Sequence, residues 1–368
     1  MSRRLTLVIG LVALQALALV VVLGISYFTS QDELLDYAEG LAARIASDTT
    51  AYTEDFLDPA NDAADLSYRL AETGVLDPTD REKLTRYFFE TLRVQEQFAG
   101  IYYGVDNGDF LYVSRDGAED GADFRVKEII TRPRRIVDLA WYNEGFRLIS
   151  DRKEPEDDYD PRIRPWYNNA LEAGGASWTS PYIFFTSKKP GITVSVPVDD
   201  PLTGETQGAI GVDIGIEALS RFLEDLQISP NGSAAIVAET GDIIAHSDPA
   251  LVATTEANGT VRFSTLSDGG DPILTQAVAE MDAGLEGLFP GEVRVSRFRA
   301  DGEVWLGAVQ RLQLERTPWT VVTYLPQSDI LEPLWRLRNT AIWVAVLALL
   351  ATAALGLLYG GAVMRSRQ

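Results

Sequence analysis

The densest cluster of chemically specialised side chains in this sequence lies between Tyr159 and Tyr182, in the segment YDPRIRPWYNNALEAGGASWTSPY. Pro165 disfavours the helical region for the preceding Arg164 and suits the first position of a helix, so we predict that a helix begins at Pro165. Gly174 can end this helix because glycine tolerates positive φ. Arg164 would then lie at a helix N-terminus, where free backbone N–H groups and a planar guanidinium can together bind a carboxylate.

Aromatic side chains surround this arginine. Trp166 and Tyr167 fall in the first turn of the predicted helix, while Tyr159 and Tyr182 belong to the flanking loops. Small-molecule pockets are commonly walled by such rings, with a few polar groups fixing the ligand. The segment therefore predicts an aromatic pocket around a cation.

An acidic residue occurs in a second segment, Gly208 to Gly215, which has the pattern of a strand. Alternation puts Ile210 and Val212 on one face and Asp213 on the other, among glycines. Asp213 should therefore project from a face kept bare by glycines. A pocket with this carboxylate at one end and an arginine at the other would be complementary to a small zwitterion.

The motifs DPRIRPWY, WTSPY, ITVSVPV and GAIGVDI together resemble the double-Cache (dCache) extracellular sensor domains of bacterial transmembrane receptors. The resemblance covers most of the chain between its two hydrophobic ends, and it is strongest to the amino-acid-binding subset. It implies that Tyr159, Arg164 and Trp166 contact the ligand carboxylate. It further implies that Tyr167, Tyr182 and Asp213 contact the ligand amino group. No catalytic residue, metal or cofactor is implied.

Composition excludes several classes of function. The chain has 32 basic and 54 acidic residues, a net charge of −22, which argues against a nucleic-acid partner because a phosphate backbone needs a basic surface. It contains no cysteine and one histidine, His246, so thiol dyads and Ser-His arrangements are excluded and metal ligands are in short supply. A carboxylate pair is the only catalytic chemistry left, and no spacing singles one out. We therefore predict a protein that is not an enzyme, with His246 in a structural role.

Two uncharged segments predict transmembrane helices at residues 5–28 and 339–364, since each is long enough to cross a bilayer. A cleaved signal peptide is the competing interpretation of the first. Arginines in residues 1–4 and 365–368 place both ends in the cytoplasm. The middle of the chain would then lie in the periplasm or outside the cell, held by the inner membrane in a two-pass arrangement.

Hydrophobic periodicity divides the middle of the chain into three parts. Residues 29–73 predict a long stalk helix, which Pro59 should kink or interrupt. Residues 74–228 predict a membrane-distal PAS-like module of antiparallel strands and helices, with a hairpin turn at 106–109. Residues 229–335 predict a smaller, membrane-proximal PAS-like module. The fold class is therefore α+β.

The resulting function is that of a transmembrane receptor that senses a small ligand, most simply an α-amino acid. A homodimer formed through the stalk and transmembrane helices is expected, with a cytoplasmic signalling domain or partner beyond Gln368. One alternative is a different small ligand, an amine or a carboxylate. Another is a ligand-free interaction or dimerisation scaffold, in which Arg164 pairs with a neighbouring carboxylate such as Asp160, Trp166 and Tyr182 are core aromatics, and hydroxyl groups cap Asp213. Arg164 and Asp213 facing one open cavity would argue against the scaffold.

Overall fold

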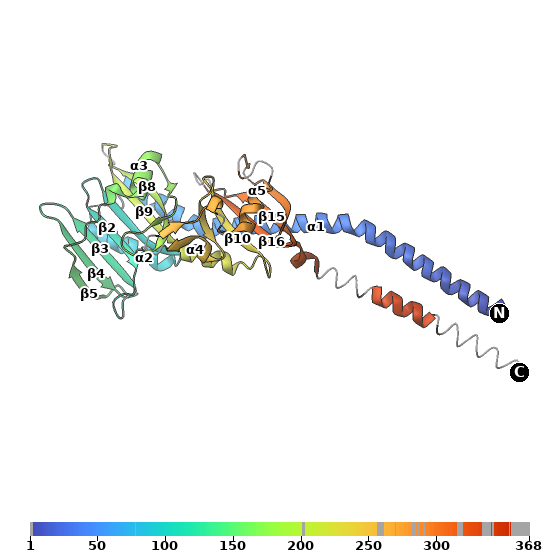
Figure 1. Ribbon diagram of the computed structural model, residues 1–368. Coiled ribbons are helices and arrows are strands. Elements are labelled where there is room, and N and C mark those ends of the chain that lie inside the picture. Colours follow the sequence, from blue (N-terminus) through green and yellow to red (C-terminus); the bar gives the residue numbers. More distant parts are fainter. Residues whose placement is uncertain are drawn as a thin grey trace.

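A long helix runs along two large antiparallel sheets (Figure 1). The computed structural model describes residues 3–77, 79–200, 203–255, 261–268, 270–281, 285, 287–289, 291–314, 319–332, 340, 342–352 and 354, with few side chains described before residue 34. Among the parts so described, no helix is both long and apolar enough to cross a membrane. Residues 5–28, where the first transmembrane helix is predicted, belong to a helix whose side chains are mostly outside that description; of residues 339–364, where the second is predicted, it includes 340, 342–352 and 354, and residues 365–368 lie outside it.

Helix α1 (Arg3–Glu72) packs along both sheets with one face. Ala38 and Ala42 are fully buried against the second sheet, and further along the helix Leu57 and Ala60 are fully buried against the first. The apolar stripe of this helix is therefore used, at least in part, within its own chain. The prediction that Pro59 interrupts the helix is wrong, because α1 continues through it, anchored by the buried residues on either side.

The N-terminal module comprises the elements from α2 to α4 and is built on a nine-stranded sheet in the order β5-β4-β3-β2-β1-β9-β8-β6, with β7 paired to β8. Its strands are β1 (Phe98–Val105), β2 (Phe110–Arg115), β3 (Phe124–Ile130), β4 (Ile136–Tyr142), β5 (Leu148–Lys153), β6 (Ser177–Trp178), β7 (Tyr182–Ile183), β8 (Pro190–Asp199) and β9 (Thr206–Gly215). Its helices are α2 (Arg81–Val94), the short η1 (Pro161–Ile163), α3 (Pro165–Ala173) and α4 (Ile216–Asp225). All the pairings are antiparallel, as predicted.

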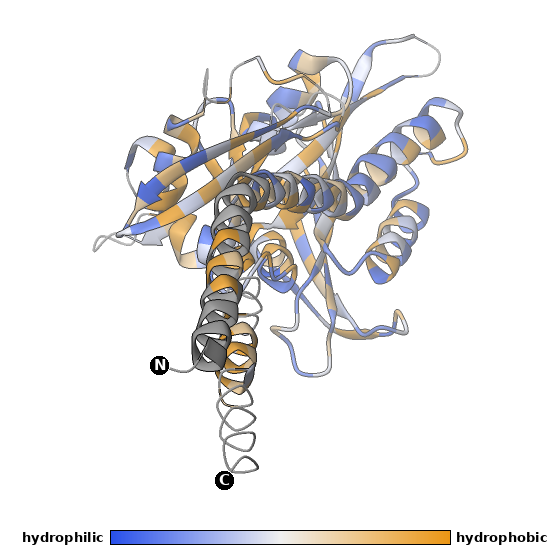
Figure 2. Cartoon of the chain, turned by 90° about the vertical axis from the view of Figure 1, so that its right-hand side faces the viewer, coloured by the Kyte–Doolittle hydropathy of each residue, from blue (hydrophilic) through white to orange (hydrophobic). Residues whose placement is uncertain are grey.

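The two faces of this sheet have different partners. Ile210, Val212 and Ile214 of β9 join a large apolar core that also contains residues of α1 and α2. The opposite face carries Tyr102, together with other aromatic rings, beneath α3. This division follows the two-residue period of the strands, along which hydrophobic and hydrophilic segments alternate in Figure 2. The aromatic face therefore forms a second, smaller core next to the predicted site.

The C-terminal module comprises the elements from β10 to β16 and contains a five-stranded sheet in the order β11-β10-β16-β15-β14. Its strands are β10 (Ser233–Ala238), β11 (Ile243–His246), β14 (Val293–Ala300), β15 (Glu303–Arg311) and β16 (Trp319–Pro326), with a small pair, β12 (Ala253–Thr255) and β13 (Val261–Phe263), beside them. Its helices are η2 (Pro249–Leu251), η3 (Leu266–Asp268) and α5 (Pro272–Ala279). The predicted α+β class with a long N-terminal helix and antiparallel sheets is confirmed.

A carboxylate ties the connection between the modules to the chain that follows β16. Asp329 lies in a helical stretch, residues 327–332, directly after that strand. Its oxygens accept hydrogen bonds from Ser229 Oγ at 2.7 Å, from Asn231 N at 2.8 Å and from Asn231 Nδ2 at 2.9 Å. Leu331 in the same stretch is buried against Ala38 and Ala42 of α1. The inter-module connection, the C-terminal stretch and α1 thus meet at one place.

Candidate functional site

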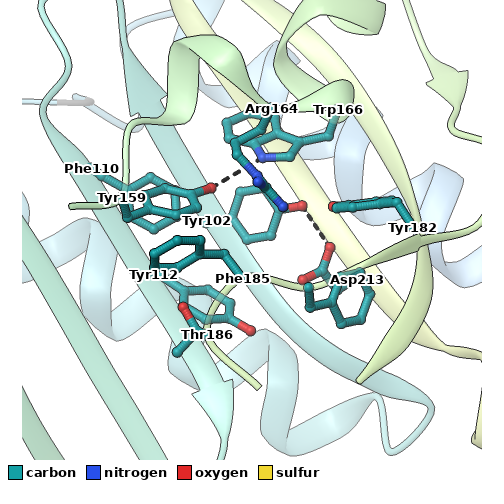
Figure 3. A pocket seen from close by; sticks show the side chains of 11 residues that line it. Tyr102, Phe110, Tyr112, Tyr159, Arg164, Trp166, Tyr182, Phe185, Thr186 and Asp213 are labelled. Atoms are coloured by element: carbon teal, nitrogen blue, oxygen red, sulfur yellow. Dashed lines mark hydrogen bonds between the residues drawn. The ribbon is translucent and has the colours of Figure 1, made fainter. Parts of the chain in front are cut away.

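Helix α3 begins and ends where the sequence predicts. Pro165 is its first residue, Arg164 is its N-cap in an extended conformation without a side-chain capping bond, and Gly174 ends it at φ 60°. Arg164 projects from this N-terminus toward the aromatic face of the sheet (Figure 3). A cavity lies there, lined by Tyr102, Phe110, Tyr112, Tyr159, Arg164, Trp166, Tyr182, Phe184, Phe185, Thr186 and Asp213.

Asp213 supplies the negative end of the cavity. Its side chain is buried on the face of β9 opposite the main core, and its Oδ1 accepts hydrogen bonds of 2.6 Å from both Tyr102 and Thr193. Burial raises the pKa of Asp213 to about 7, although those two hydroxyls and the charge of Arg164 oppose the rise. Within the described residues both hydrogen bonds end on Oδ1, which leaves Oδ2 as an acceptor for a bound molecule.

Arg164 supplies the positive end. One guanidinium nitrogen donates to the backbone carbonyl of Ile183 at 3.1 Å. The guanidinium carbon also lies 5.8 to 5.9 Å from the ring centres of Tyr159, Tyr182 and Phe185, within cation–π range. None of the ion pairs between described residues involves Arg164. Its charge is therefore held in place by rings and one carbonyl, and is not neutralised by a carboxylate.

Tyr159 and Trp166 form the wall next to the arginine. Trp166 Nε1 donates to the hydroxyl of Tyr159 at 3.2 Å, and both residues are buried. The backbone carbonyl of Trp166 accepts a hydrogen bond of 2.7 Å from Ser195 Oγ on β8, which fixes the first turn of α3 to the sheet. Burial raises the pKa of Tyr159, so its hydroxyl stays protonated and available as a donor.

Tyr182 closes the cavity on the side of Asp213. Its hydroxyl lies 2.7 Å from Thr193 Oγ1, which in turn donates to Asp213. Tyr167 is placed differently from the other predicted site residues, because it is absent from the residues that line the cavity. Its buried ring packs edge-on against Trp166, with ring centres 5.4 Å apart. The structure therefore brings together Tyr159, Arg164, Trp166, Tyr182 and Asp213, but leaves Tyr167 behind the wall.

The scaffold alternative is only partly supported by these contacts. Hydroxyls do cap one oxygen of Asp213, as that alternative expects. The expected pairing of Arg164 with Asp160 is wrong, since Asp160 binds Arg162 at 2.7 Å, on the same short turn. Arg164 and Asp213 line one cavity and form no ion pair with each other, among the pairs described.

Sequence reasoning missed Tyr102 and Thr193, the two donors to Asp213. Both come from strands that neighbour β9: Thr193 lies directly opposite Asp213, and Tyr102 lies opposite Gly211. A Cβ atom at Gly211 would lie 2.3 Å from the ring of Tyr102. The glycine thus clears space for a tyrosine that holds Asp213, whereas we expected the space for the ligand itself. A tyrosine directly opposite a glycine on the neighbouring strand would have predicted this contact, but such a pair can be recognised only when the strand register is known.

Chemically, the site offers a fixed cation, a buried carboxylate and phenolic hydroxyls in an aromatic enclosure. Such a set is complementary to a small molecule with both an anionic and a cationic group.

Comparisons with known proteins fit this architecture. The sequence model of a family described as Cache domain, dCache_1, matches residues 28–334. The methyl-accepting chemotaxis protein McpG of Pseudomonas putida is 29% identical over 180 residues, which are 47% of this chain and 27% of McpG. The methyl-accepting chemotaxis protein PscA of Pseudomonas syringae is 33% identical over 131 residues, 32% of this chain and 20% of PscA. The chain thus matches less than a third of each relative's length.

Among solved structures, the ligand-binding domain of the Pseudomonas aeruginosa amino acid chemoreceptor PctB, in complex with L-Arg, has a TM-score of 0.53 and 18% identity. That match covers 84% of this chain and 97% of the PctB domain. The ligand-binding domain of the Campylobacter jejuni chemoreceptor Tlp3, in complex with 4-methylisoleucine, has a TM-score of 0.51 and 14% identity, over 82% of this chain and 96% of that domain. At these identities the likeness establishes the fold.

Proposed function

Because this chain belongs to the Cache-domain family, we propose that residues 74–228 bind a small α-amino acid between Arg164 and Asp213. The guanidinium of Arg164 and the N-terminus of α3 receive the ligand carboxylate, assisted by Tyr159 and Trp166. Asp213 and Tyr182 receive the ammonium group.

One observation carries this proposal: Arg164 and Asp213 line the same cavity without neutralising each other. A buried charge normally has a partner, because an isolated charge in a protein interior is costly. Asp213 meets that cost in the free protein by taking up a proton near neutral pH, which its raised pKa permits. A bound ammonium would supply the missing partner and keep the carboxylate ionised. The PctB and Tlp3 ligand-binding domains were solved in complex with amino acids, L-Arg and 4-methylisoleucine, which agrees with this chemistry.

We further propose that the protein is the sensor part of a receptor held in the inner membrane by helices at 5–28 and 339–364. Residues 74–228 form its membrane-distal module and residues 229–335 its membrane-proximal module. The chain itself performs no catalysis. Its output, by way of a cytoplasmic domain or partner, is of the type that methyl-accepting chemotaxis relatives provide. A homodimer through α1 and the membrane helices is the expected assembly.

Thermal unfolding of the purified chain tests the proposed ligand class. L-alanine should raise the unfolding temperature increasingly with concentration, because it binds only the native state. Propionate lacks the amine and ethylamine lacks the carboxylate, so each should stabilise far less. If propionate stabilises the protein as much as L-alanine does, the role proposed for Asp213 is wrong. If ethylamine does so, the role proposed for Arg164 is wrong. No stabilisation by any α-amino acid would refute the proposed function.

A further inference from the structure

The cavity between Arg164 and Asp213 is too small for the ligand class proposed. Its free volume is about 20 Å³, enough for a single water molecule but not for an amino acid. Part of its wall must therefore move when a ligand binds. The residues of that wall decide where the rest of the ligand, beyond its charged groups, can extend.

One part of the wall separates the cavity from a much larger groove. Tyr112, Phe184 and Thr186 line both the cavity and a neighbouring groove of about 770 Å³. Two of these partition residues are rings that rest on glycines. The ring of Tyr112 lies where a Cβ of Gly100 would be, and the ring of Phe184 lies where a Cβ of Gly191 would be. The partition thus consists of the Tyr112 ring from β2, together with Phe184 and Thr186 from the turn after β7.

The turn that carries Phe184 has its backbone hydrogen bonds within the turn. Its side chains reach the rest of the module through ring packing of Phe185 on Tyr159 and an ion pair between Lys189 and Glu217 at 3.6 Å. Phe184 N donates to Lys189 O, and Lys188 N donates to Phe184 O, both at 2.9 Å. Lys188 has φ 57°, a conformation that costs a non-glycine residue free energy. These hydrogen bonds lie within the turn itself, so the turn can swing as a unit without breaking them. Its displacement would join the cavity to the groove.

The groove is lined by charged and hydrogen-bonding side chains as well as by apolar ones, and it has an open place beside Asp213. Asp116 and Arg125 form an ion pair of 2.7 Å in it, and both side chains are largely buried. Gly215, on the same face of β9 as Asp213, has no atom within 4 Å of its would-be Cβ position. Ala218 on α4 lines the groove but not the cavity. A ligand substituent that passes the partition therefore enters a space lined by charged and hydrogen-bonding groups.

We propose that this groove is the subsite for the ligand side chain, and that it selects α-amino acids whose side chain is long and ends in a polar group. This inference rests on the proposed function. In the complex, Phe184 and Thr186 move aside, the charged groups stay between Arg164 and Asp213, and the side chain runs over Gly215 into the groove. A short side chain gains nothing from the groove, and a long apolar one leaves the polar groups of the groove unpaired.

Titration calorimetry of the full chain with L-alanine, L-glutamine and L-norleucine tests this inference. L-glutamine should bind at least about tenfold more tightly than L-alanine, and more tightly than the equally long but apolar L-norleucine. Ala218→Trp and Gly215→Leu place bulk in the groove at positions outside the cavity. Each should remove most of the advantage of L-glutamine while changing L-alanine binding by less than about twofold. Ala250→Trp, at an exposed position of the C-terminal module, is the control and should change neither.

Retained L-alanine binding also shows that each variant is folded, and the two variants fill the groove from different elements. Equal affinities of the wild-type chain for L-alanine and L-glutamine would overturn the subsite while leaving the proposed function intact. The proposed subsite is also refuted if L-glutamine keeps its higher affinity in both groove variants, or if L-norleucine binds the wild-type chain as tightly as L-glutamine. If no α-amino acid binds the wild-type chain, the proposed function fails as well.

Discussion

At the scale of single residues, the site consists of two charges that the protein does not use to neutralise each other. Arg164 rests against aromatic rings, and Asp213 is capped on one oxygen by Tyr102 and Thr193. Both arrangements hold a charged group in position before any ligand binds. The residues are thus already oriented for a ligand, and the free energy of binding is not spent on ordering them.

Arg164→Ala should weaken amino-acid binding by about 10- to 100-fold, because it removes charge-assisted hydrogen bonds to the carboxylate. The free energy of unfolding should change little, since the side chain donates only to the Ile183 carbonyl among the described residues. Arg162→Ala is a matched control on the same turn, because Arg162 forms a solvent-exposed pair with Asp160. Calorimetry gives the affinity and chemical denaturation the stability. A large loss of stability in Arg164→Ala would mark the residue as structural.

The raised pKa of Asp213 makes ligand affinity depend on pH. With a pKa of about 7 in the free protein, most of the Asp213 carboxyl is protonated at pH 6 and most is ionised at pH 8. Only the ionised form attracts an ammonium group, so affinity should rise by roughly tenfold across this interval. Titrations in buffers of different ionisation enthalpy should also detect proton release on binding below pH 7. An affinity that is flat between pH 6 and 8 would contradict the role of Asp213.

The same pKa predicts how stability changes with pH. The folded state keeps the proton of Asp213 up to about pH 7, whereas the unfolded chain loses it near its ordinary value of 3.8. Between these values the native state binds more protons, so the contribution of Asp213 to stability falls as pH rises, by up to about 4 kcal/mol. Asp213→Asn should remove this part of the pH dependence. Denaturation of both proteins from pH 4 to pH 8 measures it, and identical slopes would refute the assignment.

Residue types and spacing were enough to predict that Arg164, Asp213 and most of the rings lie at one cavity, because a proline, a pair of glycines and strand alternation fix their local geometry. Tyr102 and Thr193 could not be found in this way. Their contacts with Asp213 depend on which strands neighbour β9 and in which register, and those are properties of the sheet. Tyr167, in contrast, was predicted to face the ligand but does not line the cavity, because neighbouring residues in the first turn of a helix point in different directions.

At the scale of elements, glycines in β1, β8 and β9 set the thickness of the aromatic layer. Gly100, Gly191 and Gly211 each have an aromatic ring where a Cβ would otherwise be. The strands can therefore carry large rings flat against their backbone, and α3 packs above them. The site depends on this layer, because the rings of Tyr102 and Tyr112 stand beside Asp213.

Gly211→Ala should disturb the site through Tyr102. The added Cβ would lie 2.3 Å from the Tyr102 ring, which must shift and loosen its hydrogen bond to Asp213. We expect a loss of about 1 to 3 kcal/mol in the free energy of unfolding, as for overpacking in a core, together with weaker binding. Gly215→Ala, on the same strand but beside open space, is the control and should be nearly neutral in stability. Equal stabilities of the two variants would show that the ring relaxes freely.

The elements themselves followed well from the sequence where local signals are strong. The β1–β2 hairpin and both ends of α3 lie as predicted, since turn and capping residues determine them. The expected break at Pro59 failed for a tertiary reason: Leu57 and Ala60 are buried on the sheet and hold the helix through the proline. Such packing cannot be read from the proline alone.

At the scale of the whole molecule, Asp329 joins three parts that are far apart in the sequence. It binds Ser229 and Asn231 between the modules, while the adjoining Leu331 is buried against α1. Helix α4 leads directly from the strand of Asp213 to this connection. A ligand that shifts β9 and α4 can thus displace residues 327–332 relative to α1, typically by an ångström or two.

Asp329→Ala should uncouple this displacement from binding. Cysteines introduced at Arg44 and Ser328 can carry spin labels, since the chain has no cysteine of its own. We expect saturating amino acid to change the distance distribution between the labels in the parent protein, and to change it much less in Asp329→Ala at similar affinity. Asp225→Ala, an exposed acid on α4, is the control. An unchanged distribution in the parent protein, despite binding, would exclude this route.

The overall architecture was predictable as an α+β protein with a long helix and two antiparallel modules, because strand and helix periods separate clearly along the chain. The contact between the modules was not. Ser229, Asn231 and Asp329 are ordinary loop and helix-start residues, and only the folded chain brings them together.

The rings seated on glycines also have a consequence for how such a protein changes over generations. Three glycine–ring pairs are mutually dependent, because a side chain on the glycine would occupy the place of the ring: Gly100 with Tyr112, Gly191 with Phe184, and Gly211 with Tyr102. Loss of the ring first leaves a gap that a later alanine can fill, whereas the reverse order passes through a clash. Descendants of this chain that acquire a different ligand should therefore replace ring and glycine as a pair, ring before glycine.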